Sequence, residues 1–268
     1  MLTPDGTRLA YLTRGAGEPM LMIAGLGYAS WSWSRQLPAL AEKFQVITVD
    51  NRGTGASDKP SGPYSIALLA EDMVNVLDVL SLGSAHVVGA SMGGYIAMSL
   101  ARQRPDLVRS LTLIATACGG PGSHGVPDAT KRAWAQASGN GPEAFARATM
   151  PLSFRDGWTE ENPSEYQTLL QMRLHAPTPQ HAWAAQYQAC EQYLQHGEPG
   201  EQIRTPTLVL HGTHDRIVPF ANAALIASTV PSARLVRLDR AGHLCWIEQA
   251  QRVNDLITEH AEAADDHN

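Results

Sequence analysis

The chain has 268 residues, of which 44% are hydrophobic and 17% charged, and its formal net charge at pH 7 is -6. This length and composition suit one α/β domain with or without an insertion, and the mild acidity gives no reason to expect nucleic acid or an anionic membrane as partner. Three scattered cysteines, Cys118, Cys190 and Cys245, form neither a disulfide framework nor a metal-ligand pattern. We see no signal peptide and no apolar run of about 18 residues, so we expect a soluble, cytoplasmic protein.

Short apolar runs alternate with helical patterns along most of the chain. Residues 7–13 alternate and predict an antiparallel edge strand, whereas runs rich in Val, Ile and Leu predict buried parallel strands at 19–24, 45–49, 85–89, 110–115, 207–211 and 234–238. Apolar spacings of three and four predict helices over 66–80, 92–102 and 220–229. This order predicts an α/β fold, with a mostly parallel sheet covered by helices on both faces. The polar tail, 261–268, is expected to fray.

The alternation stops between about Gly119 and Gly200, where segments rich in glycine and proline mark both ends. Inside this stretch, helical patterns cover 129–138, 143–150, 165–175 and 180–194, and no strand is indicated. We therefore expect a helical cap, residues 119–200, inserted late in a core formed by 1–118 and 201–268. Several large cap side chains either pack together or line a pocket: Trp134, Phe154, Trp158, Met172, Trp183 and Tyr187.

The segment Gly89-Ala90-Ser91-Met92-Gly93 matches the pattern G-x-S-x-G between a predicted strand and a predicted helix. This context is that of a nucleophile elbow, a tight and strained turn that needs small residues around an exposed serine. The helix N-terminus behind the serine also stabilises negative charge. We therefore predict that Ser91 is a nucleophile rather than an ordinary turn residue.

A serine hydroxyl needs a base to remove its proton, and after an elbow of this kind the acid and then the histidine follow along the chain. Asp215 lies in the loop after the predicted strand 207–211, and His243 lies in the loop after 234–238. Both loops sit at the strand ends where α/β proteins place their chemistry. Taken alone, each residue could cap a following helix. Together and in this order, they predict His243 as general base and Asp215 as the acid that orients it.

Other ionisable residues compete with this assignment but lose on position. Asp239 and Glu248 bracket His243, yet neither follows an earlier strand as Asp215 does. His86 lies inside a predicted strand and His211 ends one, so both are expected to be structural.

Attack on a carbonyl also needs N–H donors for the oxyanion. The residue after the nucleophile supplies one, here Met92, and the loop Gly25-Leu26-Gly27 supplies another, which we assign to the N–H of Leu26. These glycines could alternatively serve only the turn. Tyr28, Trp31 and Trp246 flank the loops and are predicted to line the substrate pocket. Neither a metal-ligand cluster nor a phosphate-binding loop is visible, so no metal and no cofactor are expected.

On these residues the chain resembles the α/β-hydrolase superfamily, in particular its capped esterase and lactonase-like members. The segment 50–57, Asp-Asn-Arg-Gly-Thr-Gly-Ala-Ser, is similar to the family loop D-x-R-G-x-G-x-S, and the likeness covers almost the whole chain. It implies the fold, the three catalytic roles and the position of the cap. Family members often carry His-Gly where this chain has Ala24-Gly25, a change that leaves the backbone donor of Leu26 in place. A serine nucleophile instead of aspartate argues against haloalkane dehalogenase and epoxide hydrolase activity.

The residues predict two-step acyl transfer on small to medium, largely uncharged esters or lactones, and not on long-chain fats or polymers. Hydrolysis of a carbon–carbon bond in a diketone, and acyl transfer to an acceptor such as peroxide, use the same three residues and stay open. A binding protein without activity would not need all three. The cap arginines Arg147, Arg155 and Arg173 also keep an acidic substrate open.

Overall fold

A seven-stranded sheet forms the centre of the molecule in the computed structural model, which describes residues 1–197 and 200–266. Its strands lie in the order β1-β3-β2-β4-β5-β6-β7, where β1 is antiparallel to β3 and the other neighbouring pairs are parallel. The strands are β1 (Tyr11–Arg14), β2 (Glu18–Ile23), β3 (Phe44–Val49), β4 (Ala85–Ala90), β5 (Val108–Ile114), β6 (Thr207–Gly212) and β7 (Ala233–Leu238). The predicted α/β architecture is therefore confirmed. Every residue of β4 and β6 is buried, which explains why these strands are mostly apolar in sequence.

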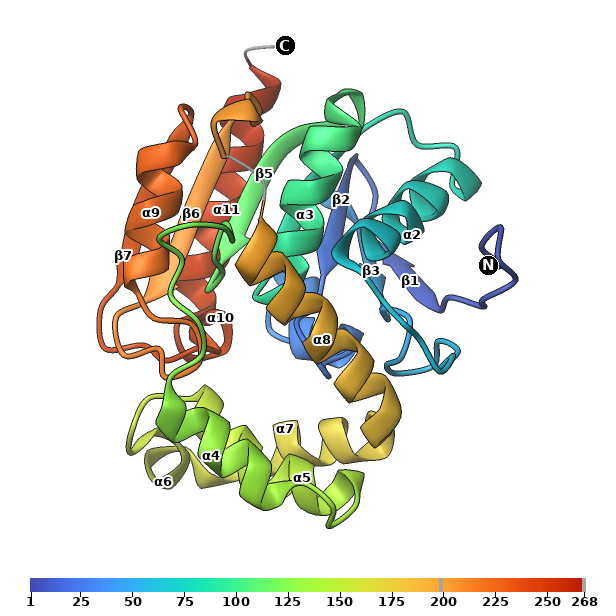
Figure 1. Ribbon diagram of the computed structural model, residues 1–268. Helices are drawn as coiled ribbons and strands as arrows, with labels where there is room; N and C mark the ends of the chain where they lie inside the picture. The colour runs from blue at the N-terminus through green and yellow to red at the C-terminus, as the bar shows by residue number, and fades with distance from the viewer. Residues whose placement is uncertain (198–199, 267–268) are drawn as a thin grey trace.

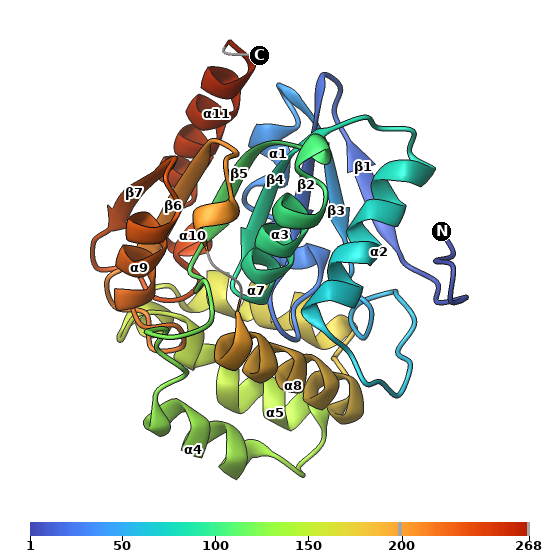
Figure 2. The ribbon, with the colours of Figure 1, turned by 45° about the horizontal axis from the view of Figure 1, so that its top comes forward.

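Helices cover both faces of the sheet (Figures 1 and 2). On one face, α2 (Ile66–Val79), α3 (Met92–Gln103) and α9 (Ala221–Thr229) enclose a core cluster with residues such as Leu69, Ile96 and Ile226. On the other face lie α1 (Leu37–Leu40), α10 (Cys245–Glu248) and α11 (Ala250–Asp265), around a second cluster that contains Leu40 and Ile257. Short 3-10 turns occur at Ser30–Trp33, Pro105–Leu107, Met150–Ser153 and Gly200–Gln202. Since both faces are covered, chemistry is left to the loops at the strand ends.

The expectation of a fraying tail from residue 261 is wrong as far as Asp265. Helix α11 continues to that residue because Ala261 and Ala264 are buried against the core. The Asp265 carboxylate also lies 3.4 Å from Arg109 and 3.3 Å from Nε2 of His86, so tertiary contacts hold a segment whose local pattern is polar. Residues 267 and 268 lie outside the described part.

Between β5 and β6 the chain forms helices that lie mostly beneath the core in Figure 1, and the last of them rises to pack against α2 and α3. The segment contains α4 (Asp128–Ala137), α5 (Pro142–Thr149), α6 (Trp158–Glu161), α7 (Pro163–His175) and α8 (Gln180–His196). Phe154 and Trp158 stack with ring centroids 4.2 Å apart and pack as core, whereas Met172 is 37% exposed. The cap aromatic residues thus divide between packing and the cavities described below. None of the described helices combines the length and the apolar character that crossing a membrane requires.

Candidate active site

Ser91 occupies the sharp turn between β4 and α3. Its backbone has φ 54° and ψ -119°, a strained conformation for a residue with a side chain. The turn is held on both sides of the serine: its N–H donates to the carbonyl of Ile114 at 2.9 Å, and Thr116 Oγ1 donates to the Ser91 carbonyl at 2.7 Å. A Cβ at Gly93 would overlap the carbonyl of Ile23, so only glycine fits where α3 approaches β2. Local sequence and tertiary packing together produce a nucleophile elbow.

Asp215 and His243 meet above the neighbouring strands. Nδ1 of His243 lies 2.8 Å from Oδ2 of Asp215, although 28 residues separate them in the chain. Oδ1 of Asp215 accepts the backbone N–H groups of Ile217 at 2.8 Å and Val218 at 2.9 Å, which leaves Oδ2 for imidazole. The carboxylate is therefore fixed in orientation before any substrate arrives.

The Asp215 carboxyl is buried, yet it stays ionised. Burial by itself raises its pKa, but attraction to His243 and the hydrogen bonds from His211 and His243 outweigh this effect and hold the pKa well below its usual range. Nε2 of His211 lies 3.2 Å from Oδ2 of Asp215 and 2.9 Å from the carbonyl of Val218. His211 thus helps to hold the Asp215 carboxylate in place and ionised, in keeping with the structural role expected for it.

The two competing acids have other partners. Asp239 is exposed and pairs with Arg237 at 3.1 Å. Glu248 is buried, and burial raises the pKa of its carboxyl. Its Oε1 accepts hydrogen bonds from the backbone N–H groups of Gly242 and Arg155, each at 3.0 Å. Glu248 therefore holds the turn that carries His243 rather than the imidazole itself.

Ser91 and His243 line one cavity of about 50 Å³, together with Gly25 and Leu26 of the oxyanion loop. The structure, which describes residues 1–197 and 200–266, has no hydrogen bond between the Ser91 hydroxyl and Nε2 of His243. In a free enzyme such bonds are commonly long, and they tighten when substrate binds. Ser91 and His243 therefore face a common space.

The predicted oxyanion donors flank the serine. A Cβ at Gly25 would lie 3.1 Å from Cβ and 3.7 Å from Oγ of Ser91, so the loop that carries Leu26 passes directly beside the nucleophile. Met92 is the first residue of α3 and follows Ser91 on its other side. Neither N–H donates to an acceptor in the described part of the chain. Both are therefore free to bind an oxyanion.

Gln186, which the sequence analysis missed, ties the cap to this loop. It comes from α8 and is fully buried; its Oε1 accepts the N–H of Gly27 at 2.9 Å, and its Nε2 donates to the carbonyl of Arg52 at 2.9 Å. The contact with Gly27 spans 159 residues of sequence, and a glutamine inside a helical pattern carries no local signal of such a role. Docking of the cap thus helps to set the conformation of the oxyanion loop.

Of the three predicted pocket residues, Tyr28 and Trp246 line the catalytic cavity. Trp31 does not line this cavity among the described residues. It packs instead against Tyr28, with ring centroids 5.2 Å apart. The cap supplies most of the remaining wall. Some of its side chains there are aromatic, and others are polar or charged. These additional residues are Trp134, Phe145, Thr149, Ser153, Arg173 and Trp183.

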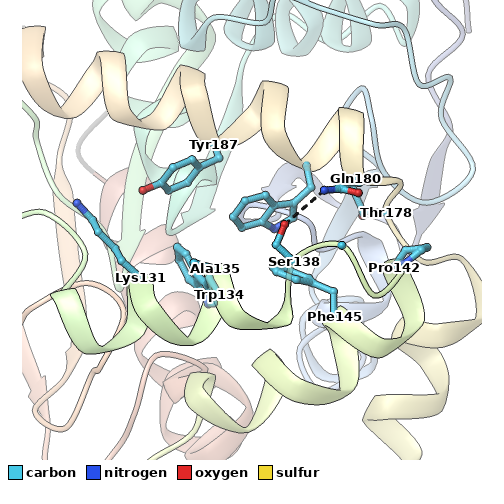
Figure 3. Close-up of a pocket in the computed structure, with 12 residues that line it drawn as sticks. Lys131, Trp134, Ala135, Ser138, Pro142, Phe145, Thr178, Gln180 and Tyr187 are labelled. Carbon is cyan, nitrogen blue, oxygen red and sulfur yellow. Dashed lines mark hydrogen bonds between the residues drawn. The ribbon is translucent and has the colours of Figure 1, made fainter.

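A second cavity, of about 210 Å³, lies inside the cap between α4, α5 and the start of α8 (Figure 3). It shares Trp134, Phe145 and Trp183 with the catalytic cavity. The Trp183 ring centroid lies 5.6 Å from that of Trp134 and 5.0 Å from that of Phe145, so the three rings form a common wall. Apolar room therefore lies directly behind the catalytic cavity. Within the described residues, no group of three or more His, Cys, Asp or Glu side chains is arranged to hold a metal ion.

This fold and this site define a class of protein. Residues 18–250 match the family model of the α/β-hydrolase fold, and the chain belongs to this family. A relative in Azorhizobium caulinodans, RutD, named for a carbamate hydrolase activity, is 34% identical over 88% of each chain. The 2-hydroxymuconate semialdehyde hydrolase of a Pseudomonas species is 30% identical over 97% of this chain and 92% of its own. The enol-lactonase of Burkholderia xenovorans has a similar structure, with a TM-score of 0.84, 28% identity, and coverage of 96% of this chain and 97% of its own.

Proposed function

We propose that the protein is a serine hydrolase that cleaves small to medium carboxylic esters or lactones through an acyl-enzyme on Ser91. One observation carries most of the weight: Ser91 and an imidazole held at 2.8 Å by an ionised Asp215 face the same cavity as the Gly25–Leu26 loop. Nucleophile, base and oxyanion donors are the groups that acyl transfer requires in one place. Membership of a family of hydrolases and the likeness to an enol-lactonase support this choice.

The mechanism runs in two steps. Oγ of Ser91 attacks the carbonyl carbon while Nε2 of His243 takes the serine proton, and Asp215 stabilises the imidazolium that forms. The N–H groups of Leu26 and Met92 donate to the oxyanion. His243 then passes its proton to the departing alcohol oxygen, which leaves the acyl group on Ser91. A water molecule, deprotonated by His243, attacks this ester and releases the acid.

The size of the substrate follows from the two cavities. The catalytic cavity holds about 50 Å³ and the neighbouring cap cavity about 210 Å³, which is small for a fatty chain. In a panel of p-nitrophenyl esters from acetate to palmitate, measured beside simple lactones, we expect the best kcat/KM at short to medium acyl length. Best turnover on palmitate would contradict an enclosed site.

Two relatives are named for substrates other than carboxylic esters, and both possibilities belong in the same panel. Carbon–carbon hydrolysis is the second candidate, because a relative of 30% identity is named as the hydrolase of 2-hydroxymuconate semialdehyde, a compound without an ester bond. A carbamate presents a similar carbonyl to Ser91, and RutD is named for that reaction. Turnover of a dienone diketone alone would move this chain to carbon–carbon hydrolysis, and turnover of a carbamate alone would replace ester by carbamate.

We expect kcat/KM to rise with pH and then to level off. A protonated imidazole cannot accept the serine proton, and a free histidine side chain titrates near about 6.5. The pKa of Asp215 lies below its usual range in the folded protein. The contribution of this carboxylate to the stability of the fold is therefore complete above about pH 4 and is lost only as the pH falls further, so unfolding should not distort the profile near neutral pH. Initial rates on p-nitrophenyl acetate, with circular dichroism at each pH as a control for unfolding, measure the profile. A rate that increases steadily toward acid would exclude a histidine base.

A further inference from the structure

One wall of the catalytic cavity carries a buried arginine. Arg173 comes from α7 and is only 7% exposed, yet it lines the cavity together with Ser91 and His243. No aspartate or glutamate is found among the described residues that line this cavity. The cation therefore faces the reacting centre without a carboxylate beside it.

The contacts of Arg173 leave most of its hydrogen-bonding capacity unused. Its NH1 group donates to the carbonyl of Ala146 at 3.4 Å, and its guanidinium carbon lies 4.8 Å from the centroid of the Tyr28 ring. It forms no ion pair in the described part of the chain, and a guanidinium has five N–H donors. Burying a charge without a partner is unfavourable. An anion in the cavity would relieve this cost.

The other two cap arginines considered from the sequence differ from Arg173. Arg147 pairs with Glu143 at 2.8 Å on the surface, and Arg155 pairs with Glu161. Neither lines the catalytic cavity. Beside Arg173 the cavity wall also presents hydroxyl groups: the oxygens of Tyr28 and Ser153 lie 3.1 Å apart and both residues line it. This side of the cavity is thus cationic and polar, whereas the side toward α4 and α8 is aromatic.

We propose, building on the ester hydrolysis proposed above, that Arg173 binds a carboxylate of the substrate. The ligand is an ester or lactone that carries a carboxylate a few bonds from the reacting carbonyl, because a cavity of about 50 Å³ leaves room for only a short spacer. A planar guanidinium recognises a carboxylate through two parallel hydrogen bonds, which are strong where water is excluded. The substrate is then acidic, in place of the largely uncharged ester expected from sequence.

Two matched pairs of esters test this inference by turnover. Monoethyl succinate is compared with ethyl 4-methylpentanoate, and acetoxyacetate with isobutyl acetate; in each pair an isopropyl group replaces the carboxylate at nearly the same shape. The first pair carries the anion on the acyl side and the second on the alcohol side. For at least one pair we expect the protein to favour the acidic member by about 10–100-fold in kcat/KM.

Variants assign this preference to Arg173. In Arg173→Met the ratio of the two kcat/KM values should fall to about 1, and Arg173→Lys should keep part of the preference. Arg147→Met is the matched control, since it removes an exposed cap arginine that is already paired with Glu143, and it should leave the ratio unchanged. The ratio is internal to each enzyme, so partial unfolding of a variant does not alter it.

Binding to the Ser91→Ala variant gives a readout that does not depend on turnover. By calorimetry, the acidic ester should bind about 10-fold or more tightly than its isopropyl partner, and Arg173→Met in the same background should abolish the difference. If no ester is hydrolysed but this Kd difference persists, the ester function fails and the anion site stands. If the isopropyl members bind and react as well as the acids, or if Arg173→Met weakens both members equally, Arg173 is structural and the inference is overturned.

Discussion

Replacing Ser91 by alanine is expected to lower kcat for ester hydrolysis by roughly 10³–10⁶-fold while leaving the fold intact. The substitution removes only the hydroxyl group. Ile114 and Thr116, which hold the turn, make hydrogen bonds with the Ser91 backbone and not with its side chain. Residual activity would come from binding and from the oxyanion donors. Steady-state kinetics with p-nitrophenyl acetate, together with the thermal midpoint of unfolding, measure both parts of this expectation.

Ser99→Ala is the matched control for this experiment. Ser99 lies on the same helix, α3, and its hydroxyl accepts a hydrogen bond from Gln103 at 2.9 Å without lining the catalytic cavity. It should retain nearly full activity. A fluorophosphonate should label the wild-type protein on Ser91 and fail to label Ser91→Ala. Most activity surviving in Ser91→Ala, with the label on another residue, would remove Ser91 from the mechanism.

Asp215→Asn is expected to cost on the order of 10³–10⁴-fold in kcat. Oδ1 of Asp215 already accepts two backbone N–H groups, so the asparagine must keep its oxygen there and turn its NH₂ group toward His243. An N–H donor facing Nδ1 favours the tautomer with the proton on Nε2, which cannot accept the serine proton. The charge that stabilises the imidazolium is lost as well.

The two nearby acids provide the comparison for this variant. Asp239→Asn should be close to wild type, because Asp239 is exposed and pairs only with Arg237 in the described structure. Glu248→Gln should lose less than about 10-fold, because an amide oxygen can still accept the N–H groups of Gly242 and Arg155. A larger loss in Asp239→Asn than in Asp215→Asn would show that the acid is misassigned.

Local signals in the sequence were sufficient for most of the fold and for placing the proposed catalytic residues in loops at strand ends. Buried parallel strands such as β4 and β6 are mostly apolar, and a nucleophile elbow needs glycine at positions like 93, so both can be recognised from a few consecutive residues. Asp215 follows the buried strand β6, whereas His243 follows β7, an edge strand that is only partly buried. The end of α11 was missed, since Ala261 and Ala264 become core residues only through packing against the sheet.

The sequence by itself thus determined the α/β architecture, the serine at the sharp turn, and the loops that carry the proposed acid and base, because strand period, glycine spacing and chain order are local properties. Only the tertiary structure decided that the Asp215 carboxylate reaches His243, that Gln186 holds the oxyanion loop, and that Trp31 lies behind Tyr28. The tertiary structure also showed that Arg173 lines the cavity, whereas Arg147 and Arg155 form ion pairs elsewhere. Which of several like side chains faces a cavity depends on how the cap helices dock on the core, and residues far apart in the chain set that docking.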